Sequence, residues 1–253
     1  MPSAIRLPSK VSDRLNIIEL IQFILEEVCW IRTDHKYLME TNQPDYSTHN
    51  ILFRYNYPYK SEELITMELA TAFISTTDYL EGEKISPIRH EYLGGQIFAM
   101  SGGSEEHNRI ALNIASLLRF HLRESGCKTF IAEMKVKIAI AENSSDIFYY
   151  PDVMVTCDPQ DTEKYYKSFP CLIVEVLSPS TQDLDRREKR LNYQSLASLQ
   201  EYVLVSQTEM KVEIYSPSKV GYWSRKSLGK EDYLELNSVG LTLTMADIYD
   251  EVL

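Results

Sequence analysis

The sequence predicts a mixed α/β (α+β) fold in which helices cover both faces of a β-sheet. One observation is the segment Phe169–Leu177, whose CLIVEVL run is apolar at nearly every position. Such a strand is buried on both faces, so helices must cover the sheet. The second observation is the order α, β, β, β, α, β between Ser104 and Ser206. This order indicates a sheet enclosed between two helices.

The first part of the chain has a different pattern from the rest. Residues 1–66 contain one amphipathic helix pattern, roughly Asp13–Trp30, followed by an aperiodic polar stretch, Thr33–Asn56. We therefore expect an N-terminal extension of low order in its second half, and a domain spanning residues 67–253. The extension is either a lineage-specific addition or an artefact of an upstream start site.

The domain opens with three elements that carry local signals. Phe73–Ser75 leads into a short helix, Thr76–Leu80, with Thr76 or Thr77 as N-cap. Glu91–Met100 contains a Gly-Gly turn between apolar residues and predicts a β-hairpin. The strongest helix pattern is Ser104–Glu124, which Ser104 caps and Gly126 ends.

The remaining elements follow from alternation and apolar runs. Four strands are expected, at Lys128–Ile140, Phe148–Cys157, Phe169–Leu177 and Glu201–Ser206, with a helix at Asp183–Leu196 before the last. An antiparallel meander is expected on the C-terminal side, at Lys211–Ser216, Gly221–Ser227 and Tyr233–Leu236, closed by a helix at Met245–Val252.

Charge and cysteine content limit the function classes. The chain of 253 residues has a formal net charge of -11, so its surface as a whole repels nucleic acid and anionic membranes. A bound divalent cation would invert the field within one site, so a phosphodiester-cleaving enzyme remains compatible with this charge. The four cysteines show no metal-type spacing and are interpreted as buried free thiols. With no signal peptide and no apolar run that spans a bilayer, the protein is expected in the cytoplasm, away from membranes.

Two carboxylates lie inside apolar strand patterns. Glu175 is the centre of the LIVEVL run, and Asp152 lies between Pro151 and the apolar residues 153–155. An ionised carboxylate in such a strand costs several kcal/mol unless it is paired or bound to a metal. Glu175 could instead point outward or pair with a lysine. Two carboxylates on neighbouring strands can converge on one hard cation, which makes them candidate metal ligands.

The helix that follows Glu175 carries Asp185, Lys189 and Tyr193. The spacing of four places these side chains on one helix face, directed towards the end of the strand. An ion pair on a solvated face would give the same spacing. The position directly after Glu175 favours a role in the site.

These motifs together carry a family resemblance. PDVMV (151–155), VEVLSPST (174–181), the D-x-x-x-K-x-x-x-Y run and EYVLV (201–205) resemble the Uma2 family (DUF820) of restriction-endonuclease-like proteins. HEYLGGQIFAMSGGSEEHNRI (90–110) resembles the opening hairpin and first helix of that family. The resemblance covers residues 67 to the C-terminus.

The resemblance implies the PD-(D/E)xK nuclease core and hydrolysis of DNA phosphodiester bonds with Mg²⁺, which Mn²⁺ can replace. It implies Asp152 and Glu175 as catalytic metal ligands, joined by the backbone carbonyl of Val176. The position two after Glu175, where many relatives in the wider superfamily have lysine, is Leu177. Because leucine cannot activate water, Lys189 is the expected catalytic replacement.

Three further residues are candidate substrate-binding groups, and other functions stay open. His107 lies in the first turn of the 104–124 helix, where a surface or cap role is equally ordinary; Asp185 and Tyr193 complete the set. No ligand is assigned to Gly94-Gly95-Gln96, where relatives commonly carry an acidic turn. One alternative to the nuclease is a catalytically silent binding or assembly module, such as a homodimer. Another is a metal-dependent hydrolase of small phosphate esters.

Overall fold

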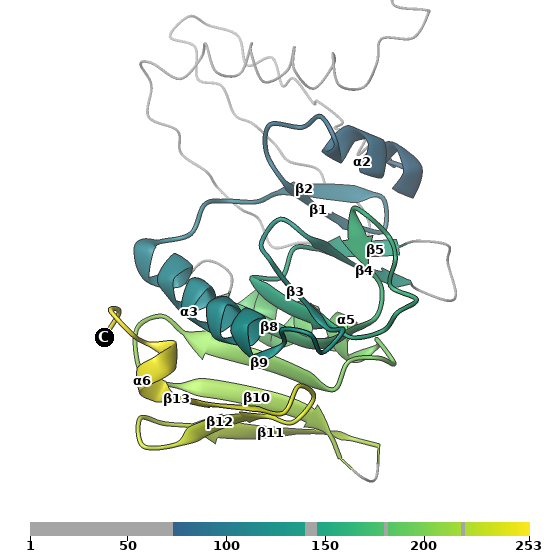
Figure 1. The fold of residues 1–253 in the computed structure, drawn as a ribbon. Coiled ribbons are helices and arrows are strands. Elements are labelled where there is room, and N and C mark those ends of the chain that lie inside the picture. The colour runs from purple at the N-terminus through teal and green to yellow at the C-terminus, as the bar shows by residue number, and fades with distance from the viewer. Residues whose placement is uncertain (1–72, 140–145, 180–181, 219–220) are drawn as a thin grey trace, which may run out of the picture. The chain divides into compact units, whose positions relative to one another are not determined.

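A computed structural model describes residues 73–139, 146–179, 182–218 and 221–253. The expected helix at Asp13–Trp30, the polar stretch after it and the boundary after residue 66 lie outside these residues. The described part is a mixed α/β domain, as predicted, and Figure 1 shows its elements. No helix in this part is both long enough and apolar enough to cross a bilayer.

The centre of the domain is a six-stranded sheet with the order β11-β10-β9-β8-β6-β3. Strands β8 and β9 run parallel, and the other neighbouring pairs are antiparallel. Every residue of β8 is buried, which confirms the prediction made from its apolar run. The strands are β3 (Lys128–Ile131), β6 (Val153–Thr156), β8 (Pro170–Leu177), β9 (Glu201–Ser206), β10 (Val212–Pro217) and β11 (Trp223–Leu228).

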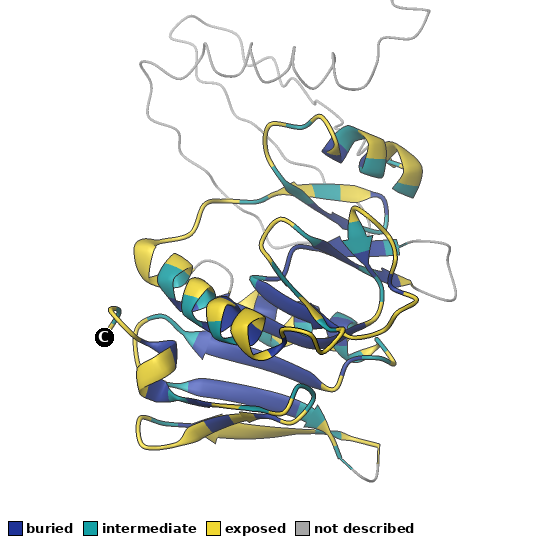
Figure 2. Ribbon diagram, viewed as in Figure 1, coloured by how far each residue is buried: buried dark blue, intermediate teal, exposed yellow. Residues whose placement is uncertain are grey.

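One face of this sheet packs against α3 (Glu105–His121). Ile110, Ile114 and Leu118 recur at helical spacing and are fully buried against alternate residues of the sheet. The same core includes residues of α6 (Met245–Ile248) and of a two-stranded sheet, β12 (Tyr233–Leu236) with β13 (Leu241–Thr244). Figure 2 shows the central strands buried while the outer face of α3 and the edge strand β11 are exposed.

The opposite face packs against a second sheet and a helical segment. The second sheet has five strands in the order β2-β1-β5-β4-β7. Its strands are β1 (His90–Leu93), β2 (Gln96–Ala99), β4 (Lys135–Ala139), β5 (Asp146–Tyr149) and β7 (Tyr166–Lys167), and α2 (Thr76–Glu83) precedes them. Residues from both sheets, among them Val136, Tyr149, Ile173 and Leu204, form one shared apolar core.

The helix expected at Asp183–Leu196 is a composite of three short pieces. These are α4 (Gln182–Leu184), a π-helical turn η2 (Asp185–Lys189) and α5 (Arg190–Gln194). π-turns inside helices occur frequently at functional sites. Here the turn lies directly beside the buried carboxylate strand β8.

Two of the expected strands are each broken in two. Lys128–Ile140 divides into β3 and β4, and Phe148–Cys157 divides into β5 and β6, with the two parts of each in different sheets. The first break coincides with a positive φ of 23° at Ala132, and the second with Tyr150-Pro151-Asp152, where proline has no N–H for a ladder. The two sheets share a core, so both halves of each expected strand carry buried apolar residues. The sequence pattern therefore shows no interruption at either break.

Several boundaries also differ from the predictions. Ser75, not Thr76 or Thr77, caps α2, since its side chain accepts a hydrogen bond from the Asp78 N–H. Helix α3 ends at His121, three residues before the expected end, and Glu124 and Gly126 then both adopt positive φ. Of the expected C-terminal meander, β10 and β11 pair with each other, whereas β12 pairs with β13, a strand that was not predicted.

The cysteines depart from the interpretation as free thiols. Cys127 and Cys157 form a disulfide, and Cys171 is buried and free. Strands β3 and β6 pair with Lys128 opposite Thr156, so the cysteines just outside that pair face each other with Cα atoms 4.1 Å apart. Because disulfides are rare in the cytosol, this bridge removes one argument for a cytoplasmic location, which stays a prediction.

Candidate functional site

Asp152 reaches the site because the chain changes sheets immediately before it. Tyr149 ends β5 in one sheet and Val153 begins β6 in the other. The Asp152 carboxylate accepts a hydrogen bond from the Val176 N–H at 2.7 Å and lies 3.1 Å from the His107 Nε2. These contacts fix one of its oxygens in place where β6 begins and β8 ends.

Glu175 lies next to Asp152 because of the strand register. Val153 pairs with Val174, so the residues one step further along each antiparallel strand are adjacent. The Asp152 N–H donates to Glu175 Oε2 at 3.3 Å, and the Tyr193 hydroxyl donates to Glu175 Oε1 at 2.8 Å. Glu175 is 3% exposed, which answers the question whether it points outward.

Lys189 is the cation at the centre of the buried acids. Its Nζ lies 2.8 Å from Glu91 Oε1, 3.5 Å from Asp185 Oδ1 and 3.7 Å from Glu175 Oε1. It also lies over the ring of Tyr149, 5.3 Å from the ring centroid. The ammonium group therefore joins β1, β8 and the π-turn η2.

Burial and local charge shift the protonation of these groups. Burial raises the pKa of Glu175 well above its ordinary value; Lys189 opposes this shift, and the charges of Asp152 and Asp185 add to it. For Lys189, burial lowers the pKa, but Glu175, Glu91 and Asp185 outweigh burial and raise it. A hydrogen bond to Asp152 raises the pKa of His107, although burial opposes it. The arrangement thus holds Lys189 as an ammonium and favours an additional cation near Glu175.

The group opens into a pocket of about 500 Å³. Asp152, Glu175 and Lys189 line it together with His107, Glu91 and Tyr149. Phe98 and the Met100–Gly103 loop contribute another part of its wall. Gly103 lies close to His107: a Cβ at this position would stand 2.9 Å from the imidazole Nδ1. A substrate entering the pocket would therefore meet the carboxylates and the ammonium group at once.

The structure brings all the predicted site residues together. Asp152, Glu175 and Lys189 form the centre, His107 contacts Asp152, and Asp185 and Tyr193 contact Lys189 and Glu175 respectively. Leu177 is buried in the apolar core on the same face of β8 as Glu175, so the position of the usual lysine is filled by packing. Val176 was expected to offer its backbone carbonyl to a metal, which stays a prediction; in the structure its N–H donates to Asp152.

Glu91 is the residue that sequence reasoning missed. It is 8% exposed on β1 and makes the shortest ion pair to Lys189. The hairpin was predicted, but its pairing with β5, which turns Glu91 towards the helix, is a long-range contact. Its sequence neighbours are His90 and Tyr92, so no apolar run marks Glu91 as buried.

The residues fit a hard divalent cation only as an incomplete ligand set. In the described ranges, no three His, Cys, Asp or Glu side chains form a ready-made metal cage. Mg²⁺ is usually held by one or two carboxylates, with water and substrate phosphate completing its shell. Asp152 and Glu175, which lie next to each other, match that donor set. Burial is the main cause of the raised pKa of Glu175, and the charges of Asp152 and Asp185 add to it.

The fold and this site define a mixed α/β domain with a buried carboxylate–lysine centre. The Uma2 family, described as "Putative restriction endonuclease", matches residues 77–246, and the chain belongs to this family. Relatives in Synechocystis sp. PCC 6803 include "Uncharacterized protein slr1290", 38% identical over 70% of this chain and 91% of the relative. A second, "Uncharacterized protein sll1609", is 32% identical over 60% of this chain and 84% of its own length.

A solved structure shares the fold. It is described as a putative nuclease belonging to DUF820 from Anabaena variabilis, with a TM-score of 0.56 and 16% identity. The match covers 71% of this chain and 99% of the other. This likeness supports the mixed α/β fold, with mixed sheets flanked by helices.

Proposed function

We propose that this protein is an Mg²⁺-dependent endonuclease that hydrolyses phosphodiester bonds of DNA. The observation that carries the proposal is the meeting of Asp152 and Glu175 from neighbouring strands beside a buried Lys189, at the base of a pocket. Membership of the Uma2 family supports the reaction class.

Asp152 and Glu175 would hold Mg²⁺, or Mn²⁺ in its place. When bound, the ion supplies positive charge for the phosphorus centre and acidifies water. His107 and the Val176 N–H keep the Asp152 carboxylate oriented, and Tyr193 does the same for Glu175. Their role is to restrict carboxylate rotation before substrate binds.

Lys189 acts as a fixed positive charge. Since neighbouring carboxylates raise its pKa, it stays protonated and cannot serve as a general base. Its ammonium can donate to the attacking water or to a phosphate oxygen and stabilise negative charge on phosphorus. This compensates for the leucine at position 177.

The test is cleavage of supercoiled plasmid with and without Mg²⁺. We expect nicking by the wild type in Mg²⁺, none in EDTA, and at least roughly 100-fold slower nicking by Glu175→Gln and Asp152→Asn. Glu235→Gln, on the exposed face of β12, is the matched control, purified identically to reveal a contaminating nuclease. Equal nicking by Glu175→Gln and the control would overturn the proposal.

Two alternatives are distinguished by the same preparations. The net charge of -11 favours a small phosphate ester over a polyanion, so a hydrolase of such esters would cleave p-nitrophenyl phosphate and leave plasmid intact. A silent binding module would show no hydrolysis. Calorimetric titration with Mn²⁺ then separates them: an enzyme binds Mn²⁺ and loses that site in Asp152→Ala, while a silent module binds none.

A further inference from the structure

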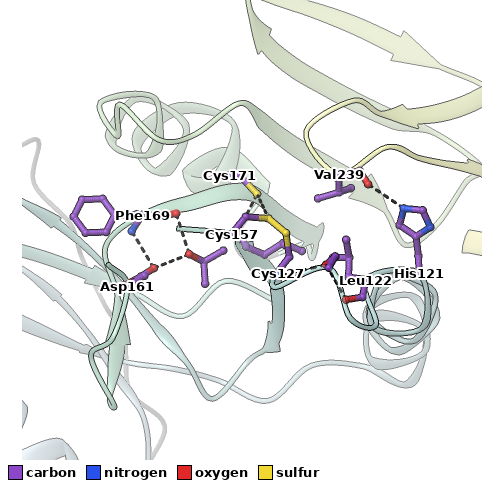
Figure 3. Close-up of a disulfide and its surroundings, with 11 residues drawn as sticks. His121, Leu122, Cys127, Cys157, Asp161, Phe169, Cys171 and Val239 are labelled. Carbon is purple, nitrogen blue, oxygen red and sulfur yellow. Dashed lines mark hydrogen bonds between the residues drawn. A yellow bond between two sulfur atoms is a disulfide. The ribbon is translucent and has the colours of Figure 1, made fainter. Parts of the chain in front are cut away.

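Three sulfur atoms lie together at one end of the central sheet. Cys127 comes just before β3, Cys157 just after β6, and Cys171 near the start of β8. The disulfide joins Cys127 and Cys157, and the Cys171 Sγ lies 3.7 Å from the Cys157 Sγ (Figure 3). Cys157 is therefore the sulfur that both of the others can reach.

The three cysteines differ in access to solvent. Cys157 is exposed and Cys127 is half-buried, whereas Cys171 is 6% exposed and its thiol donates to the Val155 carbonyl oxygen at 3.4 Å. An external thiol can thus approach Cys157 but not Cys171. Burial raises the pKa of the Cys171 thiol to about 11, which keeps it protonated at neutral pH.

A basic pocket lies beside the disulfide. It has a volume of about 390 Å³, and its lining includes Cys127, Phe130 and the three cations Arg119, Arg123 and Lys128, against one acid, Glu124. Such a local excess of positive charge stands out in a chain with a net charge of -11. Such a pocket would attract small anions and would stabilise negative charge on the Cys127 sulfur once the disulfide opens.

We propose that the Cys127–Cys157 disulfide is a thiol-exchange site for an anionic low-molecular-weight thiol, which the basic residues around Cys127 attract and which attacks at the exposed Cys157, with Cys171 as the resolving thiol. The proposal rests on the three sulfurs and the pocket, and is independent of nuclease activity.

The exchange balances without an added oxidant or reductant. The incoming thiolate attacks the Cys157 Sγ, the bond between Cys127 and Cys157 breaks, and Cys127 leaves as a thiolate beside Arg123 and Lys128. The thiol of Cys171 then gives its proton to water and attacks the Cys157 Sγ. A Cys157–Cys171 disulfide forms and the external thiolate is released, so one disulfide has been replaced by another.

The test compares thiols of opposite charge on the full-length chain purified without reductant. The protein is incubated with glutathione, an anion, or cysteamine, a cation, at matched thiolate concentrations. Free thiols are then blocked with N-ethylmaleimide, and peptide mass mapping identifies the linkages. We expect glutathione to consume the Cys127–Cys157 bridge roughly tenfold faster at low salt, and the difference to shrink in 1 M salt as charges are screened.

Two variants separate the pocket from the resolving step. Arg119→Gln with Arg123→Gln should remove the preference for glutathione, while Lys226→Gln, on the exposed strand β11, should retain it. In Cys171→Ser a glutathione adduct on Cys157 should persist, whereas the wild type should convert it to the Cys157–Cys171 bridge. Thermal unfolding checks that Cys171→Ser is folded, and Cys171→Ala serves as a second variant.

Several outcomes would overturn the proposal. They are free Cys127 and Cys157 in the untreated protein, equal rates for the two thiols, and identical products from wild type and both Cys171 variants.

Discussion

A single ammonium group contacts three buried acids of the candidate site. Lys189 has a side chain 8% exposed and contacts Glu91, Glu175 and Asp185, whose side chains are 10%, 4% and 3% exposed. Removing one partner of a buried ionic group costs more than the pair contributes, because the remaining charges stay desolvated. Lys189 is therefore a structural as well as a functional residue.

Lys189→Met should destabilise the domain in a pH-dependent way. We expect the free energy of unfolding to fall by about 3 kcal/mol at pH 8, since the acids remain buried without their cation. Without Lys189 the folded-state pKa of Glu175 rises further above its unfolded value. A carboxyl group of this kind contributes stability below its unfolded pKa and loses it as pH rises through the folded pKa. The difference in free energy of unfolding between the wild type and Lys189→Met should therefore be smaller at pH 5 than at pH 8. Urea unfolding in EDTA measures this difference.

The control for this prediction is Lys226→Met, which removes an exposed lysine from β11 and should change stability by less than about 0.5 kcal/mol at either pH. A gap for Lys189→Met that stays constant between pH 5 and pH 8 would show that lost packing, not unpaired charge, causes the effect.

At the residue scale, the sequence could identify carboxylates in apolar strands but not their partners. Asp152 and Glu175 were visible because charge inside an apolar run is costly. Glu91 was not identified, because its burial depends on β1 pairing with β5 more than 50 residues along the chain. The role of His107 as a contact of Asp152 likewise depends on where α3 begins over the sheet.

At the scale of elements, local patterns predicted the existence of helices and strands better than their ends. The structure confirms the hairpin of β1 and β2 and the strand β9. Both could be predicted because their signals are local: a Gly-Gly turn for the hairpin and a short apolar run for β9. The breaks between β3 and β4, and between β5 and β6, depend on which sheet each half joins. The four-residue spacing of Asp185, Lys189 and Tyr193 is typical of an ordinary α-helix. It therefore could not predict the π-turn at 185–189.

The helical segment that carries Lys189 is held to β10 by an ion pair and a cation–π contact, and an arginine of β11 shares the same β10 carboxylate. Arg186 donates twice to Glu213 at 3.2 Å, and Arg225 lies 3.4 Å from the same carboxylate. Arg190 lies over the ring of Tyr215 at 5.3 Å. These contacts hold one side of the segment while Lys189 faces the site from the other.

Arg186→Met should loosen this fastening and affect the site at a distance. We expect the free energy of unfolding to fall by roughly 1–2 kcal/mol, which is less than for a fully buried pair. The effect is smaller because Arg225 still reaches Glu213 and because the Arg186 side chain is 31% exposed. Hydrogen exchange of residues 185–194 should accelerate more than that of β8. Arg187→Met, an exposed neighbour, is the matched control, and uniform acceleration in both variants would contradict a local role.

At the scale of the whole molecule, the disulfide links two segments that are 30 residues apart. A bridge closing a loop of this length stabilises by about 3–4 kcal/mol in the chain-entropy account. Cys127→Ser should therefore lower the melting temperature. Reductant should lower the melting temperature of the wild type and leave that of this variant unchanged. Equal melting temperatures for oxidised wild type and Cys127→Ser would contradict a stabilising bridge.

The net charge of -11 opposes the binding of nucleic acid by this protein. Repulsion should make metal-free DNA binding weak, and any binding should depend on a cation that neutralises the site. We expect a fluorescently labelled duplex to bind at least roughly tenfold more tightly in Ca²⁺, which occupies oxygen sites without promoting cleavage, than in EDTA. Fluorescence anisotropy measures this difference.

The variant Asp152→Asn identifies the source of that difference, because it removes one of the two proposed metal ligands while leaving the surface charge almost unchanged. Its affinity in Ca²⁺ should fall to the wild-type value in EDTA, whereas Glu235→Gln, which changes net charge by the same amount on exposed β12, should keep the Ca²⁺ effect. If Ca²⁺ improves binding equally in all three proteins, general screening of the acidic surface is the cause. The metal would then have no specific place between Asp152 and Glu175.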